Sequence, residues 1–152
     1  MNIAGFFSLE NSDYHKALKE AARGMTRVQE MDYLFKLIAY MVSARMKIRH
    51  VALFYFDKRI HAYVLKVKRG NVRLQQGLKI DALSPIVELM KGRKEIIIKK
   101  DIERTIRERS RHIGFEDQKF TRILPRVKAQ AEEIGASVCV PCFGKGGLLG
   151  FL

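Results

Sequence analysis

The residues Cys139-Val140-Pro141-Cys142 form a CxxC motif, the pattern in this chain with the clearest chemical potential. In redox proteins this motif begins a helix, whose dipole lowers the pKa of one thiol. Here the motif lies in an apolar stretch that predicts a strand, where residues three apart point to opposite faces. A zinc site would need a second such pair. We therefore interpret both cysteines as structural, with a cysteine-based redox sensor or enzyme as the alternative.

The four histidines, His15, His50, His61 and His112, are far apart in the sequence and show no HExxH or similar metal-binding spacing. No GxSxG elbow accompanies the serines, and no GxGxxG loop is present. The stretch FGKGGLLG lacks the glycine spacing and the Ser or Thr of a P-loop, so we interpret it as a hairpin turn. The sequence thus predicts no catalytic residues, no metal site, no haem and no other cofactor.

Positive charge is the most unusual bulk property, because 29 Lys and Arg against 16 Asp and Glu give a net charge of +13. Such a charge attracts polyanions whatever the fold. Arg104, Arg107 and Arg111 recur at helical spacing and offer donors to phosphate oxygens. Glu103 and Glu108 interleave with them, and no aromatic stacking motif is evident, which favours a solvated helix face. We expect no nucleic-acid partner and keep a basic nucleic-acid-binding module as an alternative.

The elements that position these residues are expected to form one domain, since 152 residues with 47% hydrophobic content suffice for one core. No apolar run reaches the roughly 18 to 20 residues that cross a bilayer, and MNIAGFF lacks the features of a signal peptide. Two cysteines are too few for a secreted disulfide framework. These features predict a cytoplasmic protein without a membrane span.

Two helices are predicted at the N-terminus. The polar residues 11–13 offer N-cap side chains to a short helix that Gly24 ends. From Thr26 to Met46 apolar residues recur at steps of three and four, which predicts a second helix. Because its apolar arc is wide, this helix is either a central core helix or a helix that packs against a dimer partner.

Three strands are predicted next. HVALFYF (50–56) and IHAYVLKVKRG (60–70) are rich in β-branched and aromatic residues, and residues 57–59 form the turn between them. Gly70-Asn71 signals a second turn, after which VRLQQGLKI (72–80) is predicted to be a third strand. The three strands form an antiparallel meander.

Helices and short strands alternate in the second half. Ser84-Pro85 predicts the start of a short helix that Gly92 ends, and KEIIIKK then predicts one strand. Asp101 is predicted to cap an amphipathic helix with Ile102, Ile106 and Ile113 on its apolar side. A last helix, about 123–134, is expected to bury Leu124, Val127, Ala131 and Ile134 and to end at Gly135, before the strand ASVCVPCF.

This order of elements, the SPI segment at 84–86 and the tail GASVCVPCFGKGGLLGFL resemble the GAF domain family. In that family a helix ends at a small residue, a strand runs into a proline, and a glycine turn leads into an apolar last strand, as Gly135, Pro141, Gly144 and residues 147–152 do here. PAS and longin-like folds fit the order less well. The resemblance implies an α+β fold, in which an antiparallel sheet of five or six strands has helices on both faces.

The resemblance assigns residues 1–25 to a lead-in helix and residues 26–152 to a GAF-like domain whose last strand is truncated. It also implies a small-molecule pocket roofed by the middle helices. The residues it suggests for this pocket are Tyr63, Arg73, Ser84 and Arg104. The Asn-Lys, Phe and Asp-Glu set of the cyclic-nucleotide-binding members is absent, so the ligand is unidentified. The adjacent cysteines do not match the arrangement of the free methionine sulfoxide reductases, the enzyme branch among GAF relatives.

Such domains commonly regulate an attached kinase, cyclase, phosphohydrolase or transcription module. We therefore expect a regulatory small-molecule-sensing module of a multidomain signal-transduction protein, with its output domain outside these residues. We also expect a homodimer formed through the N-terminal helices. This domain itself is not expected to be an enzyme.

Overall fold

The computed structural model describes residues 4–109 and 118–152, without the side chains of residues 4–14, 28, 109 and 118–121. The chain divides into two units, Met1–Ile38 and Ala39–Leu152. Arg111, His112 and Ile113 lie outside the described residues. The predictions made for these three residues therefore stay predictions.

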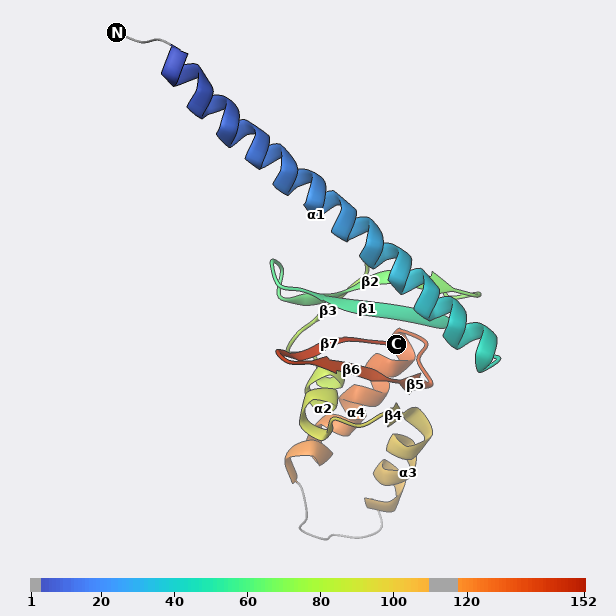
Figure 1. The fold of residues 1–152 in the computed structure, drawn as a ribbon. Coiled ribbons are helices and arrows are strands. Elements are labelled where there is room, and N and C mark those ends of the chain that lie inside the picture. The colour runs from blue at the N-terminus through green and yellow to red at the C-terminus, as the bar shows by residue number, and fades with distance from the viewer. Residues whose placement is uncertain (1–3, 110–117) are drawn as a thin grey trace. The chain divides into compact units, whose positions relative to one another are not determined.

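One long helix, α1 (Ala4–Arg45), occupies the N-terminal part of the chain (Figure 1). The prediction of two helices divided at Gly24 was wrong, since α1 starts before residues 11–13 and continues through Gly24. A glycine inside a helix costs only about 1 kcal/mol relative to alanine, and the adjacent Ala21, Ala22 and Met25 are good helix formers. Among the described residues, no helix is both long and apolar enough to cross a membrane.

The strands β1 (Val51–Asp57) and β2 (Ala62–Arg69) form the predicted antiparallel hairpin. The Asp57 carboxylate stabilises the turn by accepting hydrogen bonds from the backbone N–H and the guanidinium of Arg59, at 3.0 to 3.2 Å. Because these bonds favour the charged carboxylate, they lower the pKa of Asp57. Gly70, with a φ of 83°, makes the predicted second turn.

The third strand is much shorter than predicted, since β3 is only Lys79–Asp81. Residues 75–78 form a turn in which the N–H of Leu78 donates to the carbonyl of Gln75 at 3.1 Å, and Gly77 has a φ of 79°. A residue with positive φ interrupts strand geometry. Leu74 lies before this turn and outside any strand, but its side chain is still buried.

β7 (Gly147–Phe151) pairs with β1, and β6 (Pro141–Gly144) pairs with β7. The result is an antiparallel sheet of five strands in the order β3-β2-β1-β7-β6, which confirms the predicted α+β class and sheet type. β4 (Ile97–Ile98) and β5 (Val138–Cys139) form a separate pair. Val140, between β5 and β6, exchanges backbone hydrogen bonds of 2.9 and 3.1 Å with Leu152. The pairing of β6 with the C-terminal strand therefore continues towards β5.

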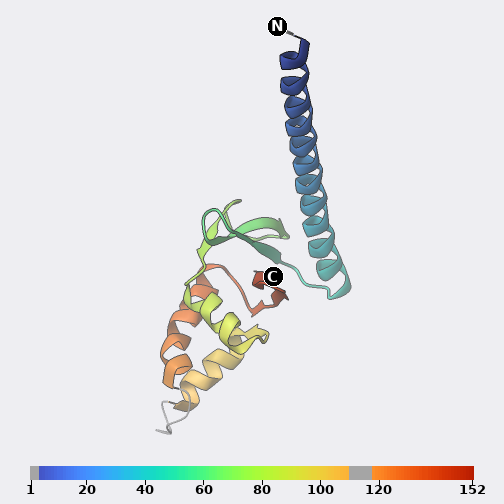
Figure 2. The same ribbon diagram turned by 60° about the vertical axis from the view of Figure 1, so that its left-hand side comes forward.

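Three helices lie together on one side of the sheet: α2 (Pro85–Arg93), α3 (Lys99–Arg109) and α4 (Gln118–Glu133) (Figures 1 and 2). The predicted start of α4 at about residue 123 was late, because the helix begins at Gln118 and includes Pro125. Its apolar stripe is confirmed, since Leu124, Val127 and Ala131 are buried and Ile134 packs against the core.

The ends of α2 and α3 differ from the prediction. α2 begins after Ser84 as expected, but its last turn is closed by Lys94, which has a φ of 55° and donates its N–H to the carbonyl of Met90 at 2.9 Å. Gly92 is therefore inside the helix. α3 begins at Lys99, so that Asp101 lies in its first turn and is not the N-cap. A carboxylate in the first turn still stabilises the helix through its dipole.

The core fills the space between these helices and the facing side of the sheet. Tyr63 and Leu65 from β2, Ile86 and Met90 from α2, and Phe151 from β7 are among its members, each exposing 2% or less of its surface. The core thus joins segments that are about ninety residues apart in the sequence.

Candidate functional site

Tyr63, the first pocket candidate, is a core residue. Only 1% of its surface is exposed, and its hydroxyl donates a hydrogen bond of 2.9 Å to the carbonyl of Leu148. Its ring packs against Phe56 and Phe151, at centroid distances of 5.1 and 5.6 Å. Burial raises the pKa of Tyr63, since the charged phenolate would lose its hydration. The hydroxyl therefore already has a partner within the protein.

Ser84, the second candidate, occupies the N-cap position of α2 with an extended backbone, at φ −65° and ψ 152°. Its side chain is buried, and its hydroxyl makes no cap hydrogen bond. Among the described residues the Ser84 hydroxyl has no other hydrogen-bond partner. The neighbouring N–H of Ile86 instead donates to the side-chain carbonyl of Gln130 on α4, at 3.0 Å. The start of α2 is thus tied to α4 through Gln130, and Ser84 contributes an unpaired hydroxyl.

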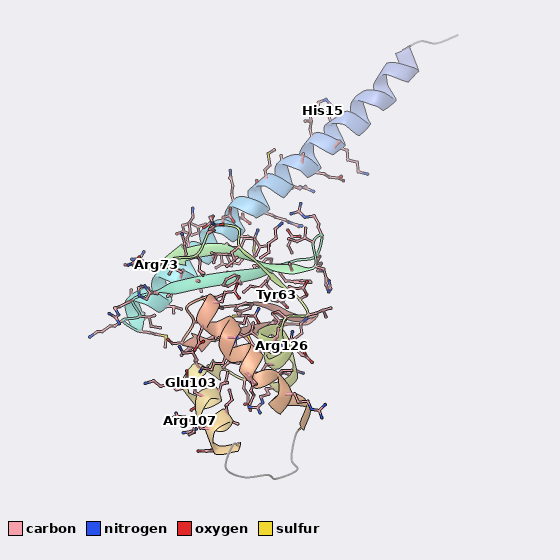
Figure 3. All side chains as sticks on the ribbon, turned by 180° about the vertical axis from the view of Figure 1, so that it is seen from behind. His15, Tyr63, Arg73, Glu103, Arg107 and Arg126 are labelled. Atoms are coloured by element: carbon pink, nitrogen blue, oxygen red, sulfur yellow. The ribbon has the colours of Figure 1, made fainter. Side chains whose placement is uncertain are left out.

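Arg73 and Arg104, the other two candidates, are both exposed. Arg73 lies in the segment between β2 and β3, and Figure 3 shows it at the end of the sheet, away from Tyr63 in the middle. Arg104 lies on α3, where its guanidinium donates to the Asp101 carboxylate at 3.1 Å. The candidates therefore divide into two interior and two surface residues. Their role in binding a ligand stays a prediction.

The region between the sheet and the helices, where the resemblance implies a ligand, is filled by the protein's own side chains. Tyr63, Ile86, Met90 and Phe151 are almost completely buried there. Ligand pockets for drug-sized molecules usually have volumes of at least about 300 Å³. A ligand of that size would have to displace core side chains.

A small hollow of about 140 Å³ lies beside α3. Its lining comes from the end of α2, from β4, from the first turns of α3 and from Leu124 of α4, with Arg93, Glu95, Asp101 and Thr105 as its polar members. The Thr105 hydroxyl donates to the carbonyl of Asp101 at 2.9 Å. At about 30 Å³ per water molecule, the hollow has room for roughly four to five waters or a very small ligand. The sequence marks this hollow by no motif; its one local signal is that Asp101 and Thr105 are one helical turn apart.

The two cysteines lie in strand structure, but the single strand predicted for ASVCVPCF is divided in two, with Cys139 in β5 and Cys142 in β6 of the five-stranded sheet. Both are free thiols, and Cys139 is buried whereas Cys142 is exposed. Burial raises the pKa of Cys139 to about 12, and it also raises the pKa of Cys142. A raised pKa keeps a thiol protonated at neutral pH, whereas redox catalysis needs the thiolate. The local environment therefore favours structural cysteines.

Among the side chains that the structure describes, the remaining polar groups form local pairs and no cluster of metal ligands. In the part of the chain with described side chains, no three His, Cys, Asp or Glu residues are grouped as metal ligands. On α3, Arg107 donates to the backbone carbonyl of Glu103 at 3.4 Å, and the Glu103 carboxylate lies 4.0 Å from Lys128 on α4. Figure 3 shows Glu103 and Arg107 on α3, and Arg126 on α4. These local pairs agree with a solvated helix face.

Comparison with known protein families finds no match, and a search of curated proteins also finds none.

Proposed function

We propose that this chain is a GAF-like regulatory module of a cytoplasmic multidomain signal-transduction protein, which dimerises through α1 and controls an output domain outside these residues. The order of elements supports this proposal: a helix, three strands in a meander, a short helix, a short strand, two helices, a second short strand and a final pair of strands joined by a glycine turn. This is the order from which the resemblance to the GAF family was drawn. Helices on both faces of the sheet remain part of the proposal.

The observation that carries the proposal is an apolar patch on α1, centred on Leu37. Residues three and four positions away on a helix are surface neighbours. For Leu37 these four neighbours are Tyr33, Leu34, Tyr40 and Met41, and all five side chains are exposed, by 39 to 69%. We call these five residues the Leu37 patch. Contiguous apolar surface of this kind is typical of an interaction site.

The magnitude of the available burial favours a reversible dimer. Fully burying one large apolar side chain contributes about 1.5 to 3 kcal/mol, so half-exposed side chains contribute about 1 kcal/mol each. A two-fold symmetric contact uses the Leu37 patch of both copies, which gives roughly 10 kcal/mol. Association costs about 4 to 15 kcal/mol in lost freedom. With a cost at the low end of that range, about 6 kcal/mol remains, which corresponds to a dissociation constant in the range of tens of micromolar. A dimer of this affinity forms and dissociates within the concentration range that light scattering covers.

The sensing part of the proposal rests on the hollow beside α3. Its polar lining, Arg93, Glu95, Asp101 and Thr105, suits a small polar ligand whose binding shifts the position of α3. Such a module acts by binding and not by catalysis. The raised pKa of Cys139 and Cys142 speaks against the redox alternative.

The test is the molar mass of the purified 152-residue chain, measured by light scattering over a range of concentrations. The expected mass rises with concentration from 17.5 kDa for one chain towards twice that value. Leu37→Asp places a charge in the middle of the patch, so this variant should stay monomeric. Leu83→Asp is the matched control, because Leu83 is 79% exposed and far from α1 in the sequence, and it should dimerise as the wild type does.

A wild-type chain that stays monomeric at every concentration would refute dimerisation through α1. If Leu37→Asp dimerises to the same extent as Leu83→Asp, the dimer uses another surface. Sensing is tested on the same samples by thermal shift with small polar metabolites, since a ligand of the native state raises its apparent stability. The absence of any shift would leave dimerisation as the only function.

A further inference from the structure

One end of the β1–β2 hairpin carries a concentration of positive charge that the proposed function does not use. The sequence contains no acidic residue between Asp32 and Asp57, and none between Asp57 and Asp81. Within these stretches six exposed basic residues belong to the end of α1, the loop before β1, and the end of β2 with its following turn: Arg45, Lys47, Arg49, Lys68, Arg69 and Arg73. We call these six residues the basic end.

The strand register brings the two halves of the basic end together, the loop before β1 and the end of β2. Val51 pairs with Arg69 and Ala52 with Lys68, so the start of β1 lies beside the end of β2. Gly70 approaches the backbone of Arg49 so closely that a Cβ on Gly70 would lie 1.9 Å from the Arg49 carbonyl oxygen. The loop before β1 and the turn after β2 are therefore in direct contact.

Two further interactions hold the side chains of this region. The Lys68 ammonium donates to the carbonyl of Leu74 at 2.6 Å, which folds the segment around Arg73 back towards β2. The Arg69 guanidinium lies 4.9 Å from the centre of the Tyr40 ring at the end of α1. Figure 3 shows Arg73 at the end of the sheet where the chain leaves α1.

The acidic residue of this hairpin is at its other end. Asp57 pairs with Ala62 at the β1–β2 turn and forms an ion pair of 3.0 Å with Arg59. The charge of the basic end is therefore not neutralised by Asp57. Clustered charge of one sign attracts a surface of the opposite sign over a distance of about one Debye length, roughly 8 to 10 Å at physiological salt.

Two apolar residues in the same loop indicate which anionic surface fits. Met46 is 67% exposed and Ile48 is 39% exposed, and they alternate with Lys47 and Arg49. Ser43 holds the loop in place, since its carbonyl accepts the N–H of Ile48 and its hydroxyl donates to the carbonyl of Ile48, both at 3.2 Å. The exposed apolar side chains are thus presented by a hydrogen-bonded turn.

We propose that the basic end, with Met46 and Ile48, is a docking surface for a lipid bilayer that contains anionic headgroups. Lys and Arg contact the phosphate and carboxylate groups of the lipids, while the two apolar side chains enter the boundary between headgroups and acyl chains. A nucleic acid would use the same cations, but its phosphates offer nothing to Met46 and Ile48. The combination of charge with exposed aliphatic side chains therefore favours a bilayer.

The first test is co-sedimentation of the full 152-residue chain with vesicles. One set consists of phosphatidylcholine alone and the other of phosphatidylcholine and phosphatidylserine in equal parts. The expected result is binding to the phosphatidylserine vesicles only, weakened by added salt. Each cation near an anionic bilayer changes the affinity by about fivefold, so Arg49→Gln combined with Arg73→Gln should lower it by roughly twenty-fivefold.

The matched control is Lys58→Gln combined with Lys145→Gln, which removes the same charge from exposed turns at the opposite end of the sheet. This control should bind almost as the wild type does. An equal loss in both double variants would overturn the proposal, because it would mean that only the net charge of +13 matters. Absence of binding to the phosphatidylserine vesicles would overturn it as well.

A second variant distinguishes a bilayer from a nucleic acid. Met46→Gln combined with Ile48→Ser keeps every charge and removes the apolar contact. This variant should bind phosphatidylserine vesicles at least fivefold more weakly than the wild type, with unchanged retention on duplex DNA. Unchanged vesicle binding would overturn the proposed insertion and leave a general polyanion site. Circular dichroism of each variant confirms that the fold is retained, and light scattering reports the dimer separately.

Discussion

Removing the hydroxyl of Tyr63 tests whether this side chain is a core residue or a ligand-binding residue. Tyr63→Phe keeps the ring that packs on Phe56 and Phe151 and removes the hydroxyl that donates to the Leu148 carbonyl at 2.9 Å. A buried carbonyl that loses its donor costs about 1 to 2 kcal/mol of unfolding free energy. For a chain of this size, 1 kcal/mol corresponds to about 2 to 4 °C, so the melting temperature should fall by roughly 2 to 8 °C.

Thermal and urea denaturation, both followed by circular dichroism, measure this loss. Tyr33→Phe is the matched control, because Tyr33 is 69% exposed and the same change should alter the free energy by less than about 0.5 kcal/mol. Equal melting temperatures for the two variants would refute the buried hydrogen bond. A Tyr63→Phe chain of normal stability that has lost affinity for a metabolite would restore Tyr63 to the pocket.

The pH dependence offers an independent check of the same side chain. Burial raises the pKa of Tyr63 above its ordinary value of 10.0, so the folded state holds the phenolic proton more tightly than the unfolded state. This contribution to stability is complete below pH 10 and is lost as the pH rises above it. Wild-type stability should therefore decline more steeply than that of Tyr63→Phe in alkaline solution.

Two further changes test local environments. The pKa of Cys139 rises from 9.0 to about 12, so the wild type should lose about 1.4 kcal/mol more stability than Cys139→Ala per pH unit between those values, as measured by urea denaturation. A pH-independent difference between the two proteins would contradict the buried thiol. Gly70→Ala should cost more than about 1 kcal/mol, because a Cβ would lie 1.9 Å from the Arg49 carbonyl oxygen at a φ of 83°. Gly146→Ala has open space around it and serves as the control; equal melting temperatures would refute the close approach.

Local sequence signals predicted several elements correctly. The turn at Asp57 follows from a carboxylate that bonds to the backbone two residues on, and α2 begins where Ser84-Pro85 supplies a fixed φ. The apolar stripe of α4 has helical spacing and is buried. These features depend on neighbours within a few residues, which is why the sequence alone suffices for them.

Three predicted element boundaries depended on glycines, and the structure places these boundaries elsewhere. Gly24 was predicted to end a helix, but α1 continues through it. Gly77 lies inside the predicted strand 72–80, but the turn that includes Gln75 and Gly77 replaces most of that strand. Gly92 was predicted to end α2, but the helix includes Gly92 and its C-cap is Lys94. In each case a glycine permits a turn without requiring one.

The candidate site depended most on tertiary structure. The residue type favours exposure for Arg73 and Arg104. Only the fold decides that Tyr63 and Ser84 are inside, away from the two arginines on the surface. The basic end is visible in the sequence as a stretch without acids, yet its two halves meet only because β1 and β2 pair in one register and Gly70 contacts Arg49. Charge, composition and helical periodicity are properties of the sequence itself. Proximity between distant residues is decided by strand pairing and core packing, because those alone bring separate segments to one place.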